Sequence, residues 1–300
     1  MASPEIKKVA FFGLGLMGGP MAANLVRGGF DVSLWTHTEG KAERFASEHG
    51  GRPAATPRKA ADGADAAITM VVDSPEVKEV LLGDDGAAQS LADGALVVDM
   101  STIAPTAARE IGAALGERGL AFLEAPVSGS IPKATDGTLT IMAGGEPETF
   151  ARARPLLDAL GEKIVHVGPQ GHGQLAKLLT NTMGAVHAAV LGEALTVAER
   201  GGLDSDAFME VAAGSAGNSG VLALKGPPML AHEFEPPLFK LDHMLKDIRY
   251  AVAEARALGV ELQVAGLAER LYSEAAAAGH GEEDFAAIVT VAEAGVESPR

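Results

Sequence analysis

Short apolar runs alternate with helical patterns along the first half of the chain. The run Val9–Phe12 is unbroken and apolar, and a helical pattern follows it over Met17–Arg27. Apolar runs of strand length that alternate with helices are typical of a parallel sheet covered by helices on both faces. The first half therefore predicts an α/β domain. The further expected strands are Asp31–Thr36, Ala66–Val72 and Ala95–Asp99, and a helix is expected near Lys41–Glu48.

The second half has a different pattern. From about Gly168 onward nearly every segment has helical periodicity. We therefore expect an α/β domain over residues 1–167, followed by an all-α domain over residues 168–300.

One helical segment of the second half is apolar around almost its whole circumference. In Met183–Ala198 only His187 and Glu193 interrupt the apolar residues. A helix of this kind is normally buried on all sides, so we expect it to pack between layers or subunits. A helical half of about 130 residues is small for burying it completely, which favours a homodimer or tetramer. Small residues at every fourth position would let another helix approach closely, although an alanine-rich core helix explains them equally well: Gly184, Ala188 and Gly192.

The first expected strand is followed by a glycine-rich turn of the form GxGxxG. The first glycine, Gly13, permits a tight turn, Gly15 lets the backbone approach a pyrophosphate, and Gly18 lets helix and strand pack closely. The amides at the start of the helix then favour a negatively charged group. Alone the pattern is weak, but its place at the first strand–helix junction indicates a Rossmann-type dinucleotide site. The whole motif is Gly13, Leu14, Gly15, Leu16, Met17 and Gly18.

The residues that follow the second expected strand bear on the choice between NAD and NADP. An acid there would bind the ribose hydroxyls of NAD, whereas this chain has Thr36, His37 and Thr38, and Glu39 comes slightly late. Hydroxyl donors and a histidine suit a phosphate. We therefore expect a preference for NADP, with NAD possible, although His37 is also compatible with a solvated loop residue.

Two later loops carry polar groups at strand ends, where open α/β sheets bind ligands. Thr102 lies in the segment Asp99–Pro105 and is a candidate contact of the nicotinamide half, although it also fits a helix cap before Pro105. The loop Pro126–Ser130 offers backbone amides and hydroxyls that could hold a carboxylate. It does not match a GxSxG nucleophile elbow, so Ser128 is interpreted as a binding residue.

A lysine and an asparagine lie one turn apart where the helical half begins. Gly171 and Gly173 mark a loop that leads into a helix, and Lys177 and Asn181 then share one helical face. A lysine before so apolar a helix is unusual, and partial burial would suit it to proton transfer. Lys177 is therefore a candidate acid–base residue.

Composition narrows the function classes. The 300-residue chain has a formal net charge of −16 and no cysteine. The negative charge argues against nucleic acid as a partner, and the lack of cysteine excludes disulfides and thiol catalysis. Residues Met1–Lys8 lack an apolar signal core, and the charged residues within Leu175–Leu195 make it a poor membrane span. We expect a cytoplasmic protein without a metal site or a membrane segment, which binds a small carboxylate-bearing substrate.

Together these motifs resemble the β-hydroxyacid dehydrogenase family, which includes 3-hydroxyisobutyrate dehydrogenase and tartronate semialdehyde reductase. The resemblance covers nearly the whole chain, and the order of the motifs makes it specific. It rests on Gly13–Gly18, Asp99–Pro105, Ala125–Gly129, Gly171–Asn181, and Phe239 through Lys246 and Asp247.

The resemblance implies a Rossmann domain with an all-helical second domain, and a role for each matching residue. Lys177 looks like the catalytic lysine, with Asn181 as its partner, while Ser128 and Gly129 resemble the carboxylate-binding loop. The implied cofactor contacts are Thr102 and Lys246, to which we add Val72. Phe239 and Asp247 are similar to active-site positions of the glyoxylate and succinic semialdehyde reductase branch. Ser130 stands where many members have glycine, but serine is common in that branch, and we count Ser130 with the substrate-binding residues.

The expected function is hydride transfer between a nicotinamide cofactor and a small β-hydroxy acid or its semialdehyde. The alternative enzyme is an NADPH-dependent glyoxylate or succinic semialdehyde reductase. An imine reductase fits less well, because those relatives commonly have an acidic or phenolic residue in place of Lys177. A non-catalytic dinucleotide-binding module would not need both Lys177 and Asn181. A departure from the NADP-using pattern is Thr36-His37-Thr38, where relatives often have Asn-Arg-Thr.

Overall fold

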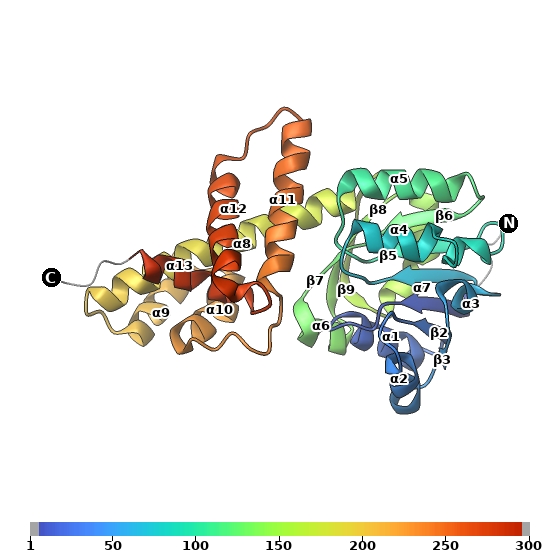
Figure 1. Ribbon diagram of the computed structural model, residues 1–300, viewed down its shortest axis with the longest axis horizontal. Helices are drawn as coiled ribbons and strands as arrows, with labels where there is room; N and C mark the ends of the chain where they lie inside the picture. Colours follow the sequence, from blue (N-terminus) through green and yellow to red (C-terminus); the bar gives the residue numbers. More distant parts are fainter. Residues whose placement is uncertain (1–5, 296–300) are drawn as a thin grey trace. The chain divides into compact units, whose positions relative to one another are not determined.

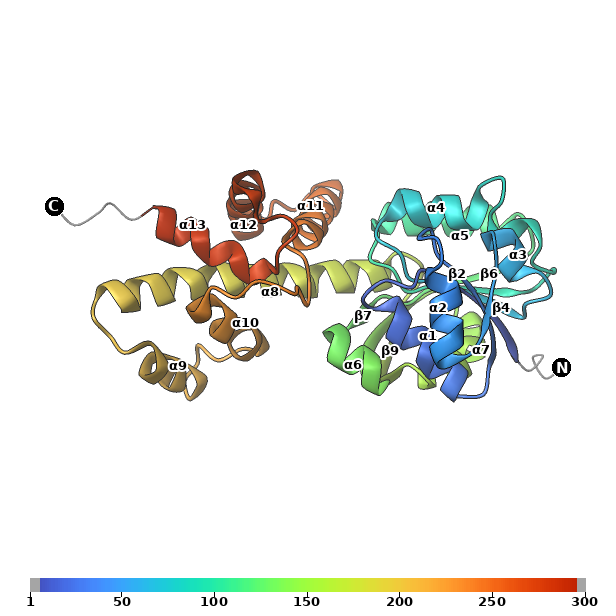
Figure 2. The ribbon, with the colours of Figure 1, turned by 60° about the horizontal axis from the view of Figure 1, so that its bottom comes forward.

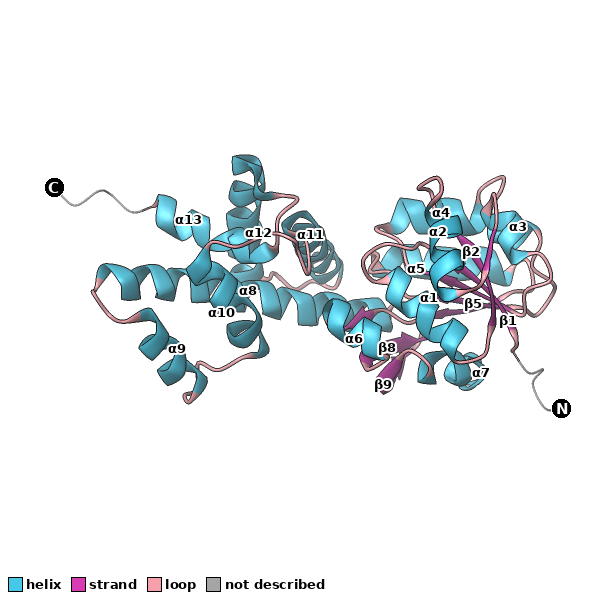
Figure 3. Cartoon of the chain, turned by 90° about the horizontal axis from the view of Figure 1, so that it is seen from below, coloured by secondary structure: helices cyan, strands magenta, loops and turns pink. Residues whose placement is uncertain are grey.

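The computed structural model describes residues 6–295, and these form two compact units that meet between Lys177 and Leu178. The first, called here the Rossmann unit, contains the strands, and the second, the helical unit, contains only helices and loops (Figure 3). The boundary expected from the sequence at residues 167 and 168 marks the change of pattern along the chain. The first unit also takes in the start of the long helix that follows that boundary.

Among the described residues, the Rossmann unit has a nine-stranded sheet in the order β3-β2-β1-β4-β5-β6-β8-β7, with β9 beside β8. The strands are β1 (Lys8–Phe12), β2 (Asp31–Trp35), β3 (Arg52–Pro53), β4 (Ala66–Thr69), β5 (Leu96–Asp99), β6 (Ala121–Glu124), β7 (Val127–Ser128), β8 (Leu139–Gly144) and β9 (Gly161–Gly168). The helices are α1 (Gly18–Arg27), α2 (Lys41–His49), α3 (Pro57–Ala61), α4 (Ser74–Leu82), α5 (Pro105–Gly116), α6 (Ser130–Asp136) and α7 (Pro147–Asp158), with a short 3₁₀ turn at Ala87–Gln89.

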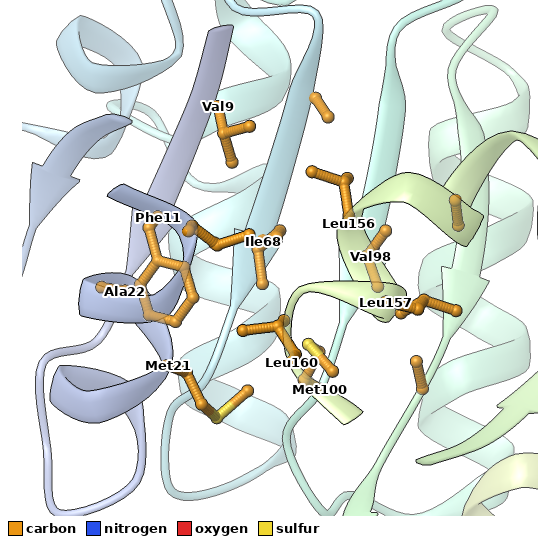
Figure 4. Close-up of a cluster of buried hydrophobic side chains, with 14 of the residues drawn as sticks. Val9, Phe11, Met21, Ala22, Ile68, Val98, Met100, Leu156, Leu157 and Leu160 are labelled. Carbon is orange, nitrogen blue, oxygen red and sulfur yellow. The ribbon is translucent and has the colours of Figure 1, made fainter. Parts of the chain in front are cut away.

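Helices cover both faces of this sheet, as the unbroken apolar strands predict (Figures 1 and 2). Along β1, Val9 and Phe11 belong to one buried cluster and Ala10 and Phe12 to another, because successive side chains of a strand point to opposite faces. The first cluster includes residues of α1 and α7, and Figure 4 shows part of it around Phe11. The second includes residues of α3, α4 and α5. The α/β prediction is thus confirmed.

The sheet is not parallel throughout, which corrects the expectation of a parallel sheet. Strands β1 to β6 pair in parallel, but β8 runs antiparallel to β6 and β7. The strand expected over Ala66–Val72 also ends early, at Thr69. Beyond it the backbone amides of Val71 and Val72 donate to the side chains of Ser101 and Glu76 in place of a strand partner.

The helical unit is built around α8. Its elements are α8 (His172–Arg200), which begins in the Rossmann unit, then α9 (Ser205–Ala213), α10 (Gly220–Ala231), α11 (Leu241–Ala257), α12 (Gln263–Ala275) and α13 (Val289–Ala294), with a π turn at Ala276–His280 and a 3₁₀ turn at Phe285–Ile288. In Figure 2, α9 and α10 lie on one side of α8, and α11, α12 and α13 lie on the other. No helix of the described residues is long and apolar enough to cross a membrane.

The apolar segment of α8 leaves one face exposed, which corrects the expectation of burial on all sides. Ala185, Ala188, Leu191 and Leu195 belong to the core of the helical unit. On another face, side chains seven residues apart are largely exposed: Met183 by 60%, Val190 by 55% and Val197 by 71%.

The small residues of α8 serve contacts within the chain. A Cβ added at Gly192 would lie 3.0 Å from the Cα of Val289 at the start of α13, and Ala188 is fully buried. A Cβ added at Gly184 would contact Val221 of α10 at 3.8 Å. The small side chains therefore let helices of the same chain pack closely, so this stripe is not the surface available to a second subunit.

Candidate active site

The turn after β1 has the stereochemistry that a dinucleotide requires. Gly13 has a φ of +96°, and a Cβ there would lie 2.2 Å from the carbonyl oxygen of Met70. A Cβ at Gly18 would lie 1.9 Å from the carbonyl oxygen of Gly13, so the start of α1 packs against the turn. Around Gly15, by contrast, nothing lies within 4 Å of an added Cβ. The two crowded glycines shape the turn, and the open one leaves room for a pyrophosphate at the helix N-terminus.

The other members of this motif are divided between core and surface. Leu14 is buried in the core of the Rossmann unit, Leu16 is 53% exposed, and Met17 is the N-cap residue of α1. Exposure of Leu16 beside the open Gly15 fits a side chain that a bound cofactor covers.

The tip of β2 has an acidic neighbour that sequence order conceals. Strand β2 ends at Trp35, so Thr36, His37 and Thr38 all belong to the following loop, where His37 and Thr38 are exposed. Nδ1 of His37 lies 3.6 Å from Oε1 of Glu76 in the first turn of α4, and Oε2 of Glu76 accepts from the amide of Val72. A carboxylate therefore does lie beside the loop after β2. It belongs to Glu76, which comes from α4 and not from the residues that directly follow β2.

A buried glutamine fixes the loop that carries Thr102. Gln174, in the first turn of α8, accepts from the amide of Ile103 at 3.0 Å and donates to the carbonyl of Ser101 at 2.9 Å. These two bonds bracket Thr102, which is half-buried, so the loop after β5 is held to the start of α8. The loop is therefore held to the first turn of α8 within the Rossmann unit.

The expected carboxylate-binding loop is partly a strand. Ser128 pairs with Thr140 in the short strand β7, and Gly129 then has a φ of +143° before α6 begins. Ser130 adopts a φ of +57°, which non-glycine residues rarely occupy. All three residues are half-buried. Their conformation turns the chain sharply from β7 into α6, where backbone amides have no partner within the helix and suit an anion.

Lys177 lies in the second turn of α8 and is only 7% exposed. The first turn is tied to β6, because Oε1 of Glu124 accepts from the amide of Gly173 at 2.6 Å and of Gln174 at 3.3 Å. Burial raises the pKa of the Glu124 carboxyl from its ordinary value of 4.5 to about 7, the backbone amides oppose that rise, and the nearby charge of Asp99 adds to it.

In the helical unit, Asn181 is held by Asp247. Nδ2 of Asn181 donates to Oδ2 of Asp247 at 2.6 Å, and Oδ1 of Asp247 lies 3.1 Å from Nζ of Lys246. The Lys246 ammonium also lies 5.3 Å from the ring centre of Tyr250. The structure thus brings together Asn181, Lys246 and Asp247, which are separated in sequence but were each expected at the site.

Phe239 lies just before α11, against His243 and Phe285, at ring-centre distances of 5.9 and 6.2 Å. Its backbone amide donates to Oδ2 of Asp284, whose carboxylate also pairs with the buried ammonium of Lys225 at 2.7 Å. Burial lowers the pKa of His243, and the charges of Lys246 and Lys240 lower it further. A neutral imidazole is therefore favoured between Phe239 and Lys246.

Sequence reasoning missed the residues that hold the expected ones in place: Glu76, Glu124, Gln174, His243 and Asp284. His243 had a usable signal, because it lies three residues before Lys246 on one face of a helix and only four residues after Phe239. The others had none, since their partners come from distant segments.

Comparisons with known proteins agree with this geometry over both units. Residues 8–168 match the family described as the NAD binding domain of 6-phosphogluconate dehydrogenase. Residues 171–292 match the family described as NAD-binding of NADP-dependent 3-hydroxyisobutyrate dehydrogenase.

Relatives match this chain over most of its length. The chain is 37% identical to an NAD-dependent L-serine dehydrogenase of Pseudomonas aeruginosa, over 94% of this chain and 97% of the relative. It is also 37% identical to a 3-hydroxyisobutyrate dehydrogenase of that organism, over 93% and 96%. A glyoxylate/succinic semialdehyde reductase of Arabidopsis thaliana is 32% identical, over 94% and 78%.

Among solved structures, a Mycobacterium tuberculosis 3-hydroxyisobutyrate dehydrogenase with L-serine superposes with a TM-score of 0.85 at 33% identity, covering 95% of this chain and 99% of the other. The resemblance inferred from the motifs is therefore confirmed. Both halves of the chain match this family, and so do relatives over most of its length. The chain therefore belongs to the 3-hydroxyisobutyrate dehydrogenase family and is an NAD(P)-dependent oxidoreductase of small hydroxy acids or their semialdehydes.

Proposed function

We propose that Lys177 is the acid–base catalyst of this oxidoreductase and that Asn181 orients it. The observation that carries the proposal is the hydrogen bond of 2.6 Å from Asn181 to Asp247. A carboxylate only accepts hydrogen bonds, so Asp247 fixes the amide with Nδ2 toward itself and Oδ1 as an acceptor. Asn181 follows Lys177 by one helical turn, and an oriented carbonyl oxygen at that spacing is suited to position an ammonium group.

The residues of the glycine turn are suited to hold the cofactor, with the pyrophosphate over Gly15 at the start of α1. Thr102, Val72 and Lys246 are proposed as further cofactor contacts. When bound, the nicotinamide supplies or accepts the hydride. The same geometry serves either direction of reaction.

The protein side chains manage the proton and the orientation of the substrate. In reduction, Lys177 hydrogen-bonds the carbonyl oxygen, stabilises the negative charge that develops on it and donates a proton to it. In oxidation, neutral Lys177 accepts the hydroxyl proton. The hydroxyls of Ser128 and Ser130 and the amide of Gly129 bind the substrate carboxylate, which fixes the reacting carbon. Phe239 and Asp247 are proposed as further residues of the substrate site.

A substrate panel with both cofactors tests this function. Purified protein should turn over at least one small hydroxy acid or aldehyde among 3-hydroxyisobutyrate, L-serine, glyoxylate and succinic semialdehyde, the compounds named for its relatives. A protein that binds the dinucleotide but turns over none of them would contradict the substrate assignment. Faster turnover of glyoxylate or succinic semialdehyde would favour the reductase alternative.

For the cofactor we propose a preference for NADP. The hydroxyls of Thr36 and Thr38 are suited to a 2′-phosphate, and His37 adds positive charge when it is protonated. Glu76, whose Oε1 lies 3.6 Å from Nδ1 of His37, opposes this preference through its own charge. NAD remains the competing choice, and titration of both reduced cofactors decides between them.

We also propose that the protein is a homodimer or a larger homo-oligomer, held by the exposed apolar stripe of α8. Met183, Val190 and Val197 lie seven residues apart and so form one stripe along the helix. Leu203, Val211 and Leu224 of the same unit are also exposed. An apolar surface of that length is costly to leave in water, and a second copy presents an identical stripe to cover it. A cytoplasmic location stays a prediction.

A further inference from the structure

The carboxyl of Glu124 lies inside the Rossmann unit at the end of β6 and has no exposed surface. Its Oε1 accepts from the amides of Gly173 and Gln174. These amides belong to the first turn of α8, where a helix has no internal acceptor for them. Glu124 thus supplies from a neighbouring strand the cap that the helix sequence does not provide.

Two glycines make room for this carboxyl. A Cβ added at Gly144 of β8 would lie 2.3 Å from Oε1 of Glu124, and one added at Gly173 would lie 3.0 Å from the same atom. The Gly173 position is also closed by the carbonyl oxygen of Met142, at 2.6 Å. The carboxyl therefore occupies a small space between β8 and α8. A larger residue at either glycine would fill this space, so Oε1 has little freedom to move.

The same turn is held a second time, from the adjacent strand. Gln174 bonds to the backbone of Ser101 and Ile103 in the loop after β5. Through Glu124 and Gln174, the first turn of α8 is fixed to the ends of two neighbouring strands. Lys177 follows Gly173 by four residues, so its direction is set by the turn that these two side chains hold.

Glu124 is suited to act as an uncharged group. Asp99 lies directly opposite it in the parallel register of β5 and β6, and both carboxyls are fully buried. Oε2 of Glu124 makes no hydrogen bond among the described residues. Two adjacent buried carboxylates cannot both ionise without a large electrostatic cost. Arg109 of α5, against Gly171, and His172, against Gly168, also lie at this turn.

From this arrangement we infer that Glu124 is a positioning residue for catalysis: its carboxyl, which caps the first turn of α8, fixes the direction from which Lys177 reaches the substrate. This inference rests on the proposed catalytic role of Lys177. It predicts that an uncharged acceptor can replace Glu124, whereas an apolar side chain of similar size cannot.

The test compares Glu124→Gln, Glu124→Met and the control Glu117→Gln, which makes the same chemical change at an exposed position at the end of α5. Glutamine keeps an oxygen that can accept hydrogen bonds from the two amides. Methionine has a similar size but lacks that oxygen. We expect kcat of Glu124→Gln and of the control to stay within about threefold of wild type, while kcat of Glu124→Met falls by on the order of 10- to 100-fold, as misplaced catalytic groups do. The dissociation constant of the cofactor should change less than about twofold in all three, because β4 and β5 separate β6 from β1, the strand that leads into the glycine turn.

Deuterium exchange gives a readout that needs no turnover. In Glu124→Met the amides of the segment 170–178 should exchange on the order of tenfold faster than in wild type, while those of α12 should not change. If Glu124→Met does not fold, Gln174→Met removes the second tie and should produce the same loss of kcat and the same local exchange.

The inference is overturned if the methionine variant keeps wild-type kcat, or if the glutamine variant is as impaired as the methionine variant. Loss of cofactor affinity in parallel with kcat would show a general structural role instead. If wild type turned over no substrate, the catalytic role of Lys177 would fail. The exchange measurement would still decide whether Glu124 holds the helix.

Discussion

Asn181 on α8 and Asp247 on α11 are joined by a hydrogen bond of 2.6 Å from Nδ2 to Oδ2. Asp247 is fully buried, and its other oxygen pairs with Lys246 at 3.1 Å. One carboxylate therefore fixes both a candidate catalytic side chain and a candidate cofactor contact. A buried acceptor with two partners of this kind is strongly sensitive to a change of chemistry.

Substitution of Asp247 should release both Asn181 and Lys246 from their shared partner. In Asp247→Asn an amide replaces one acceptor oxygen with a donor, so Asn181 can rotate and Lys246 loses its counter-charge. We expect kcat to fall by on the order of tenfold or more, since a hydrogen bond to a charged group contributes about 1.5–3 kcal/mol. Steady-state kinetics measure this, with the exposed Asp242→Asn on the same helix as the control. Unchanged kcat in Asp247→Asn would mean that Asn181 needs no such partner.

Removal of the lysine amine should abolish most turnover and leave cofactor binding intact. For Lys177→Ala we expect a loss of kcat on the order of 100-fold or more, which is typical for the loss of one acid–base group. Fluorescence titration of the reduced cofactor should give the wild-type dissociation constant. Lys163→Ala, at an exposed lysine of β9, is the matched control. A Lys177→Ala protein with near wild-type kcat would exclude the lysine as catalyst.

Burial of Glu124 should make the unfolding free energy depend on pH. Its pKa is raised from 4.5 to about 7, chiefly by burial, so between these values the native state binds more protons than the unfolded state. This contribution to stability is therefore complete below pH 4.5 and is lost as pH rises to about 7. The loss is on the order of 3 kcal/mol.

Denaturant unfolding of wild type and Glu124→Gln across that range checks this prediction. Glutamine cannot ionise, so the wild type should lose stability relative to the variant as pH rises and then run parallel to it above about pH 7. The exposed Glu117→Gln should follow wild type throughout. Parallel curves for wild type and Glu124→Gln over the whole range would show that Glu124 ionises normally.

Two substitutions at the tip of β2 should move the cofactor preference in opposite directions. His37→Asp adds negative charge near a 2′-phosphate and should weaken NADPH binding relative to NADH, because like charges repel. Glu76→Gln removes the carboxylate that lies 3.6 Å from His37 and should strengthen NADPH binding, because it removes a negative charge that repels the 2′-phosphate. Titration of both reduced cofactors into wild type and both variants measures this. Clearly tighter binding of NADH by wild type would refute the preference for NADP.

A charge on the exposed stripe of α8 should shift the protein toward monomer without unfolding it. Val197 is 71% exposed in the single chain, so Val197→Glu is tolerated there but places an unpaired charge in a subunit contact. Ala188→Glu is the contrasting variant: Ala188 is fully buried, so this change should unfold the helical unit. Light scattering at micromolar concentration, with circular dichroism, separates the two effects. A monomeric wild type would refute the proposed assembly.

Local patterns were enough to predict the α/β fold, the glycine turn and the all-helical second half. A buried strand is recognised from an apolar run of residues. The glycines of the turn are required by steric contacts within a few residues, because the backbones of Gly13 and Gly18 lie close together. The motif order was likewise sufficient for the family. These features lie in short stretches of sequence, so no knowledge of distant contacts was needed to find them.

Only the tertiary structure decided which residues hold the candidate site in place and which face of α8 is left in water. Glu124 reaches Gly173 over 49 residues, and Asn181 reaches Asp247 over 66. The apolar pattern of α8 is nearly uniform around the helix, so it could not distinguish the buried Ala188 from the exposed Val190 and Val197. Pairing across such separations depends on how strands and helices pack, and each partner taken alone is an ordinary glutamate, asparagine or valine.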